Sequence, residues 1–167
     1  GNYFTSLFLS AFLRKMKKLP IEKDTVLKRV NGIQVELAAL EQLGKLSYEE
    51  FQKEKGFELG QYHLHRALEG VFNISAHILS RIPGGQATKY KDMARNLGKF
   101  GILDKEFAET QLARMADYRV RLVHFYAEIT PEEVYKIIQE DLGDFETFLV
   151  AVKNTLEHPE KFDLMVE

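Results

Sequence analysis

Apolar residues recur every three or four positions over most of this chain, which is the spacing of one face of an α-helix. Strand-type alternation is absent over any useful length, and none of the four prolines interrupts a long periodic segment. The predicted helices cover residues 24–43, a short segment from 47, then 59–81, 89–97, 104–124 and 130–156. Because the connections are short, we expect an all-α, up-and-down helical bundle of four to five main helices.

Capping residues support these boundaries. Ser47 and Glu50 have the spacing of a capping box, in which each side chain bonds the other residue's backbone N–H. The Pro-Gly-Gly sequence at 83–85 stops the long central helix. Residues 130–133 place a threonine cap, a proline at the first helical position and a glutamate at the third, so the last helix has the clearest start.

Length and composition indicate one globular domain. The chain has 167 residues, 45% of them hydrophobic, which is enough to build a core. We expect an N-terminal extension at 1–20, the bundle at 21–158 and a C-terminal tail at 159–167. There is no cysteine, which excludes disulfides and thiolate chemistry and is consistent with a reducing cytosol, so we expect a cytoplasmic protein.

The N-terminal extension carries an apolar run at 4–13 that is followed by four basic residues within 14–18. This run is shorter than the roughly 20 residues needed to span a bilayer. A secretory signal has its positive charges before the apolar run, whereas here they follow it. We therefore expect no membrane insertion; the alternatives are a frayed or docked terminal helix and a role at a membrane surface or in a dimer.

The charge balance restricts the kind of nucleic-acid contact that this chain can make. Its formal net charge is −2, whereas a general nucleic-acid binder is usually strongly basic. Any contact with RNA must therefore depend on a local basic patch.

Four polar residues share one face of the predicted 59–81 helix, because steps of three and four residues stay on one side of a helix. They are Arg66, Glu69, Asn73 and His77. This face is either simply solvated or forms a polar wall that lines a cleft or a dimer interface.

No metal or nucleotide signature accompanies this face. The sequence has no P-loop, no glycine-rich dinucleotide motif and no His-Glu-x-x-His pattern. His63 and His65 are two positions apart and point about 160° apart on a helix. We therefore expect no metal site and no cofactor.

The second candidate site is the segment 116–126. Arginine forks suit phosphate oxygens, and Arg119 and Arg121 lie close in sequence to His124 and Tyr126. At about 100° per residue, Arg119 and His124 point about 140° apart on an ideal helix. Arg121, His124 and Asp117 instead share one face, which favours pairing of His124 with Arg121 and bracing by Asp117. For Arg119 and His124 to meet, the helix must distort or end between them, or a two-fold dimer must bring them together.

These residues carry a family resemblance. The pattern Arg119-x-x-x-x-His124-x-Tyr126 resembles the Arg-x4-His-x-Tyr motif of HepT-like proteins of the HEPN superfamily. The resemblance extends over about 26–151 and includes the segments LSYEEF, YHLHRALEGVFNISAHIL and ARMADYRVRLVH and the capped last helix.

The resemblance implies a HEPN-like bundle that acts as a metal-independent RNase toxin. Such proteins are usually homodimers with the active cleft at the interface, and their partner is a minimal nucleotidyltransferase antitoxin. Arg119 would hold the scissile phosphate, and His124 would move protons between the ribose 2′-hydroxyl and the leaving oxygen. The partner would attach AMP to Tyr126, and this bulky charged group would obstruct the phosphate site.

Two positions depart from the family pattern. Val120 follows Arg119 where the family commonly has Asn or another polar residue, and Asp117 adds a negative charge where related sequences often have Gly. Together with the acidic balance, Val120 favours an alternative, a non-catalytic helical module that docks a nucleotidyltransferase or a nucleotide. A third reading is a structural bundle whose polar face mediates only dimerisation.

Overall fold

The computed structural model describes residues 2–16, 18–124 and 128–167, with side chains at 3–10, 18–124 and 128–167. Its described part is all-α, as predicted, and apart from one isolated bridge between Ile21 and Val166 it contains no β-structure. The elements are α1 Asn2–Met16, α2 Lys23–Gly44, α3 Tyr48–Lys53, α4 Gly56–Ser80, α5 Tyr90–Lys99, α6 Lys105–Phe107, η1 Ala108–Leu112, α7 Ala113–Val123, α8 Pro131–Glu140, α9 Leu142–Glu157 and η2 Pro159–Phe162.

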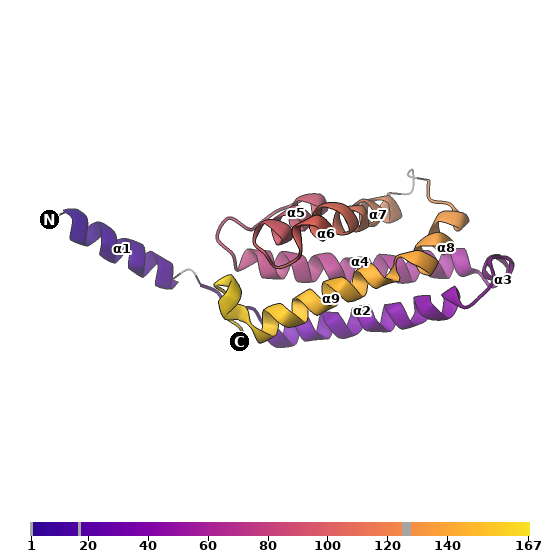
Figure 1. The fold of residues 1–167 in the computed structure, drawn as a ribbon, viewed down its shortest axis with the longest axis horizontal. Coiled ribbons are helices and arrows are strands. Elements are labelled where there is room, and N and C mark those ends of the chain that lie inside the picture. Colours follow the sequence, from indigo (N-terminus) through magenta and orange to yellow (C-terminus); the bar gives the residue numbers. More distant parts are fainter. Residues whose placement is uncertain (1, 17, 125–127) are drawn as a thin grey trace.

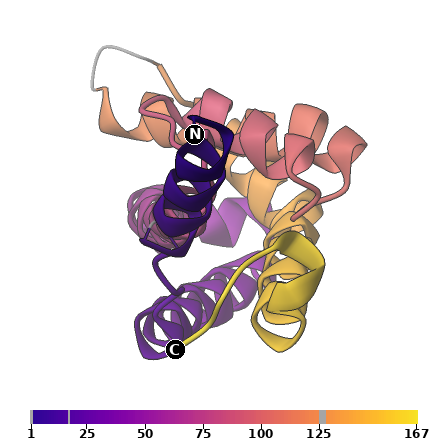
Figure 2. The same ribbon diagram turned by 90° about the vertical axis from the view of Figure 1, so that its left-hand side faces the viewer.

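The long helices lie side by side in two layers around α4 (Figure 1). Helix α2 packs along α4, and α8 and α9 return along the same pair. Helices α5 and α7 cover the other side of α4, and α6 packs on α5. The end-on view shows α4 between these two groups (Figure 2). This arrangement is the predicted up-and-down bundle.

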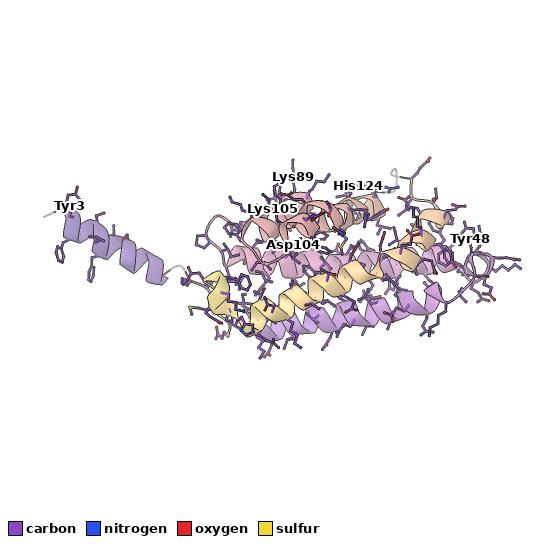
Figure 3. The ribbon with its side chains drawn as sticks, viewed as in Figure 1. Tyr3, Tyr48, Lys89, Asp104, Lys105 and His124 are labelled. Atoms are coloured by element: carbon purple, nitrogen blue, oxygen red, sulfur yellow. The ribbon has the colours of Figure 1, made fainter. Side chains whose placement is uncertain are left out.

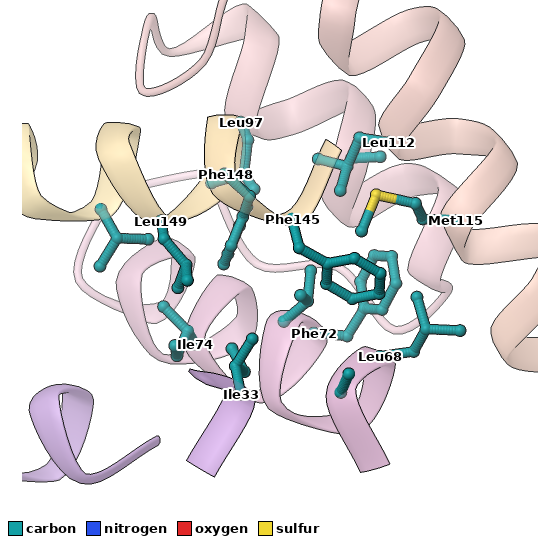
Figure 4. Close-up of a cluster of buried hydrophobic side chains, with 14 of the residues drawn as sticks. Ile33, Leu68, Phe72, Ile74, Leu97, Leu112, Met115, Phe145, Phe148 and Leu149 are labelled. Atoms are coloured by element: carbon teal, nitrogen blue, oxygen red, sulfur yellow. The ribbon is translucent and has the colours of Figure 1, made fainter. Parts of the chain in front are cut away.

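The core is centred on α4. Its buried side chains include Leu68, Phe72 and Ile74, which meet Ile33 of α2 and Phe148 of α9 (Figure 4). Each such side chain contributes about 1.5–3 kcal/mol when it is fully withdrawn from water. Helix α4 is therefore held from several sides, and the polar residues on its remaining face have fixed positions.

Helix α7 continues a longer helical path that starts after Asp104. The Asp104 carboxylate accepts a hydrogen bond from the backbone N–H of Phe107 at 3.1 Å and so caps the path. The segment η1 is π-helical, and the wider turn changes the rotational setting of the α-helix that follows it. Helix α7 then ends at Val123, because His124 has extended backbone angles of φ −88° and ψ 104°.

The prediction of one continuous helix over residues 130–156 is wrong. It is divided into α8 and α9 at Asp141, whose backbone has φ −114° and ψ 0°. The Thr130 cap and Pro131 begin α8 as expected, and the Thr130 hydroxyl accepts a bond from Glu133 N–H at 3.2 Å. Arg114 Nη2 of α7 lies 3.7 Å from Asp141 Oδ1 and 3.3 Å from Asp144 Oδ2. The break therefore places two carboxylates beside α7.

The two termini differ in how they meet the bundle. Residues 159–167, predicted as a tail, return to the start of α2, where Ile21 N–H donates to Met165 O at 2.7 Å and Leu164 is buried. Helix α1 projects away from the bundle, and its Tyr3 and Phe4 are each 88% exposed (Figure 1). None of the described helices combines the length and apolarity needed to cross a bilayer.

Candidate functional site

Arg119 lies where α7 meets α4 and α5. Its side chain is only 12% exposed, and its guanidinium lies over the Tyr90 ring, 4.8 Å from the ring centroid. Tyr90 is itself fixed by Phe72 of α4, with ring centroids 5.2 Å apart. A guanidinium on an aromatic face keeps its edges available for hydrogen bonds while its plane is held.

An ion pair with Glu69 of α4 completes the surroundings of Arg119. The same carboxylate oxygen of Glu69, Oε1, lies 3.9 Å from His65 Nε2, one helical turn back on α4. Two buried nitrogens of this cluster, Arg119 Nε and His65 Nδ1, have no hydrogen-bond partner among the described residues. We call Arg119, Glu69, His65 and Tyr90 the Arg119 cluster.

His124 lies at the end of α7, immediately after the last helical residue, and its side chain is exposed (Figure 3). Its backbone N–H still donates to Val120 O at 3.1 Å. The helix therefore ends between Arg119 and His124, which is one of the conditions under which the two could share a site. Tyr126, the third motif residue, lies outside the described residues.

Arg121 faces α8 rather than the Arg119 cluster. Both of its terminal nitrogens bond the Glu133 carboxylate, and Nη2 also donates to the backbone oxygen of Glu128 at 2.6 Å. The hydrogen bonds that Arg121 donates to Glu133 raise the pKa of Arg121 and lower the pKa of Glu133. Arg121 thus joins the end of α7 to the start of α8, and the two motif-region arginines lie on different sides of α7.

Asp117 faces α5. Its carboxylate lies 3.3 Å from Lys91 Nζ, so its nearest described cation is a lysine and neither of the predicted arginines. This pairing links the start of α5 to α7 through a second contact besides that of Tyr90 with Arg119.

The polar face predicted on α4 has three different uses. Glu69 alone reaches Arg119, whereas Arg66 Nε donates to Glu36 of α2 at 2.6 Å. His77 Nε2 accepts a bond from the Glu22 backbone N–H at 3.1 Å, and burial lowers the pKa of His77. Asn73 is exposed. Within the described residues 116–124, the structure therefore connects only Glu69 of this set with the second candidate site.

A basic stripe on α5 was not singled out from the sequence. Lys91, Arg95 and Lys99 are exposed and recur every four residues, so they share one face of α5. Lys89, just before the helix, also projects from this surface (Figure 3). Lys91 is next to Tyr90 in the sequence, so the stripe starts beside the Arg119 cluster. Part of its charge is balanced by carboxylates, because Lys91 pairs with Asp117 at 3.3 Å and Arg95 Nη1 pairs with Asp92 Oδ1 at 3.0 Å.

Metal ligands are not grouped in the described part of the chain. No set of three or more His, Cys, Asp or Glu side chains is gathered there in an arrangement that could hold a metal ion.

Comparison with known proteins finds related sequences. The family model described as "Ribonuclease HepT-like" matches residues 33–152, which span α2 to α9 and contain the Arg119 cluster and His124. The chain is also 31% identical over 88 residues to the tRNA nuclease HepT of Aphanizomenon flos-aquae (strain 2012/KM1/D3). That alignment covers 53% of this chain and 59% of the relative. The chain therefore belongs to the HepT-like ribonuclease family of HEPN proteins.

Proposed function

We propose that this protein is a metal-independent endoribonuclease in which Arg119 binds the scissile phosphate and His124 transfers protons. The observation that carries the proposal is the Arg119 cluster: a largely buried guanidinium, stacked on Tyr90, at the start of the basic stripe on α5. The name of the HepT relative supports RNA, and tRNA in particular, as the substrate class.

The chemistry follows from the two side chains. The ribose 2′-oxygen attacks the neighbouring phosphorus and loses its proton to an imidazole, while the bond from phosphorus to the 5′-oxygen breaks. The leaving 5′-oxygen takes up a proton, and the products are a 2′,3′-cyclic phosphate and a 5′-hydroxyl. The guanidinium of Arg119 would stabilise the negative charge that develops on the phosphoryl oxygens. His124 would serve the two proton transfers, because an imidazole can accept and donate protons near neutral pH.

A homodimer would bring the two groups into one cleft. Arg119 turns towards α4 and α5, whereas His124 lies beyond the end of α7 with an exposed side chain. Near the same helix end, Val120 and Val123 are 41% and 46% exposed, which suits a protein contact better than solvent. We propose that a second copy packs against this end of α7, so that His124 of one protomer serves Arg119 of the other.

Regulation would act on the segment after His124. In this proposal the protein is the toxin of a cytoplasmic toxin–antitoxin pair, and a minimal nucleotidyltransferase attaches AMP to Tyr126. Arg121 bonds Glu133 and the backbone of Glu128, so it holds the far end of this segment close to α7. A nucleotide attached to Tyr126, two positions after His124 in the sequence, would obstruct entry of RNA by its charge and volume.

The test is cleavage of tRNA in EDTA by the purified protein and by two histidine variants. His124→Ala should lower the rate by at least about 100-fold, which is the contribution typical of general acid–base catalysis. His158→Ala is the matched control, since His158 is a surface histidine at the end of α9. Equal cleavage by His124→Ala and the wild type would overturn the assignment.

The second candidate is a non-catalytic module that docks a nucleotidyltransferase. The exposed Val120, at the position after the motif arginine, favours it, because an apolar side chain there is suited to a protein contact. Tight binding of the transferase, with no cleavage of any RNA by the wild type, would select this second function.

A further inference from the structure

We propose that Glu69 is a positioning residue that controls access of anions to Arg119, a role that rests on the proposed phosphate site. Its carboxylate is ion-paired with the Arg119 guanidinium and comes from a different helix, so it occupies the position of an anion before any substrate arrives. Carboxylate and phosphate oxygens use the same donors of a guanidinium. An RNA phosphate must therefore share or replace the bond that Glu69 makes.

The surroundings of the Arg119–Glu69 ion pair allow Arg119 to exchange the carboxylate for a phosphate instead of only losing the carboxylate. Arg119 Nε is buried and has no acceptor among the described residues, so the guanidinium has an unused donor next to the one that holds Glu69. The Tyr90 ring supports the plane of the guanidinium independently of Glu69. Arg119 can thus turn from the carboxylate to a phosphate without leaving its place on the ring.

His65 provides a second partner for the displaced carboxylate. Its Nε2 is already 3.9 Å from Glu69 Oε1, and its buried Nδ1 has no partner among the described residues. Nε2 faces Glu69 and can donate to its carboxylate when it carries the imidazole proton. A small rotation of Glu69 would close this bond as the phosphate takes Arg119.

The direct test measures binding of a short 2′-O-methyl oligoribonucleotide, which lacks the attacking 2′-hydroxyl and is not cleaved. Glu69→Gln keeps the size of the side chain but removes its charge. It should bind the oligonucleotide about three- to tenfold more tightly than the wild type at moderate salt, because the competing anion has gone. Glu140→Gln, on the exposed face of α8, makes the same change in net charge and is the control.

The gain must depend on Arg119. In an Arg119→Ala background, Glu69→Gln should no longer change the affinity, which a double-mutant cycle measures. Glu69→Asp retains the charge with a shorter reach. Its affinity for the oligonucleotide should lie between those of the wild type and Glu69→Gln. This second variant also decides the matter if Glu69→Gln does not fold. No gain beyond that of Glu140→Gln, or a gain that persists without Arg119, would overturn the proposal.

Cleavage gives a separate reading. In the wild-type background, Glu69→Gln should lower KM for RNA and lower kcat, since Glu69 sets the orientation of the guanidinium within its plane, whereas Tyr90 supports only the plane. A merely structural role would lower kcat without tightening binding. If the wild type cleaves no RNA, the nuclease proposal fails, but the binding cycle still decides the role of Glu69.

Discussion

The carboxylate of Glu36 illustrates how much of the polar face of α4 is structural. Its side chain is 9% exposed and takes bonds of 2.6 Å from both Arg66 and His63, so it joins α2 to α4. Burial alone raises the pKa of Glu36, but these two bonds outweigh it, and the pKa lies below its ordinary value. Arg66 is therefore part of the scaffold, whereas Glu69, its neighbour on the same face, pairs with Arg119.

Glu36→Gln should lower the free energy of unfolding at neutral pH by about 1–3 kcal/mol, because a bond between charged groups is lost in a partly buried place. The lowered pKa fixes the pH dependence. The ionised carboxylate stabilises the fold above the ordinary value of 4.5, and this contribution disappears as the pH falls through the lower folded-state pKa. Thermal unfolding at several pH values should therefore show wild type and variant converging in acid.

The control for this change is Glu41→Gln, an exposed carboxylate on the same helix. It should alter the melting temperature little at any pH. If the melting temperatures of Glu36→Gln and the wild type differ by the same amount from neutral to acid pH, the account is contradicted.

At the scale of elements, close packing of α2 on α4 fixes where the polar face of α4 points. Gly70 allows this approach: a Cβ placed there would lie 2.5 Å from Cγ1 of Ile33. Gly70→Ala should destabilise the protein by about 1–3 kcal/mol through overpacking, even though alanine is the better helix former. Thermal or urea unfolding measures this loss.

Gly32→Ala is the matched control within α2. A Cβ at Gly32 meets no atom within 4 Å, so this variant should gain about 0.5–1 kcal/mol from helix propensity alone. Equal effects of the two substitutions would show that helix propensity, and not the α2–α4 contact, governs both positions.

The basic stripe of α5 is expected to hold the RNA backbone beside Arg119. Replacing Lys91, Arg95 and Lys99 together by Gln should weaken binding of the 2′-O-methyl oligonucleotide. It should also reduce the slope of log affinity against log salt by about 0.7 for each lost phosphate contact. The control replaces three basic side chains on other helices, namely Lys28, Lys53 and Lys153. An equal loss in both triple variants would mean that net charge, and not the stripe, attracts RNA.

The elements of this fold are largely readable from the sequence, because their signals are local. Ser47 and Glu50 form the capping box expected of them, and Thr130 caps α8. The break at Asp141 has no such local signal, because no proline interrupts the apolar pattern there. The break instead accompanies contacts of Asp141 and Asp144 with Arg114, which belongs to another helix. Glu69 was named from the sequence, but its pairing with Arg119 and the contact of Arg119 with Tyr90 were not predicted, because both depend on the packing of three helices.

At the scale of the whole molecule, the bundle and α1 are expected to be independent. Helix α1 projects from the bundle, whereas the C-terminal segment pairs with Ile21 and buries Leu164 (Figure 1). Removal of residues 1–16 should leave the melting temperature nearly unchanged. Removal of 159–167 should lower it clearly, because a buried leucine and several backbone bonds are lost. Equal losses from the two truncations would contradict this division.

The central claim is that Arg119 of one protomer and His124 of another form one RNA-cleaving site. It is tested by mixing Arg119→Ala and His124→Ala proteins, after brief partial denaturation to exchange subunits, and measuring tRNA cleavage in EDTA. Each variant alone should be inactive, and the mixture should regain about a quarter of wild-type activity, since half of the dimers then hold one intact site. A mixture as inactive as its components, or full activity in either variant alone, would contradict the claim.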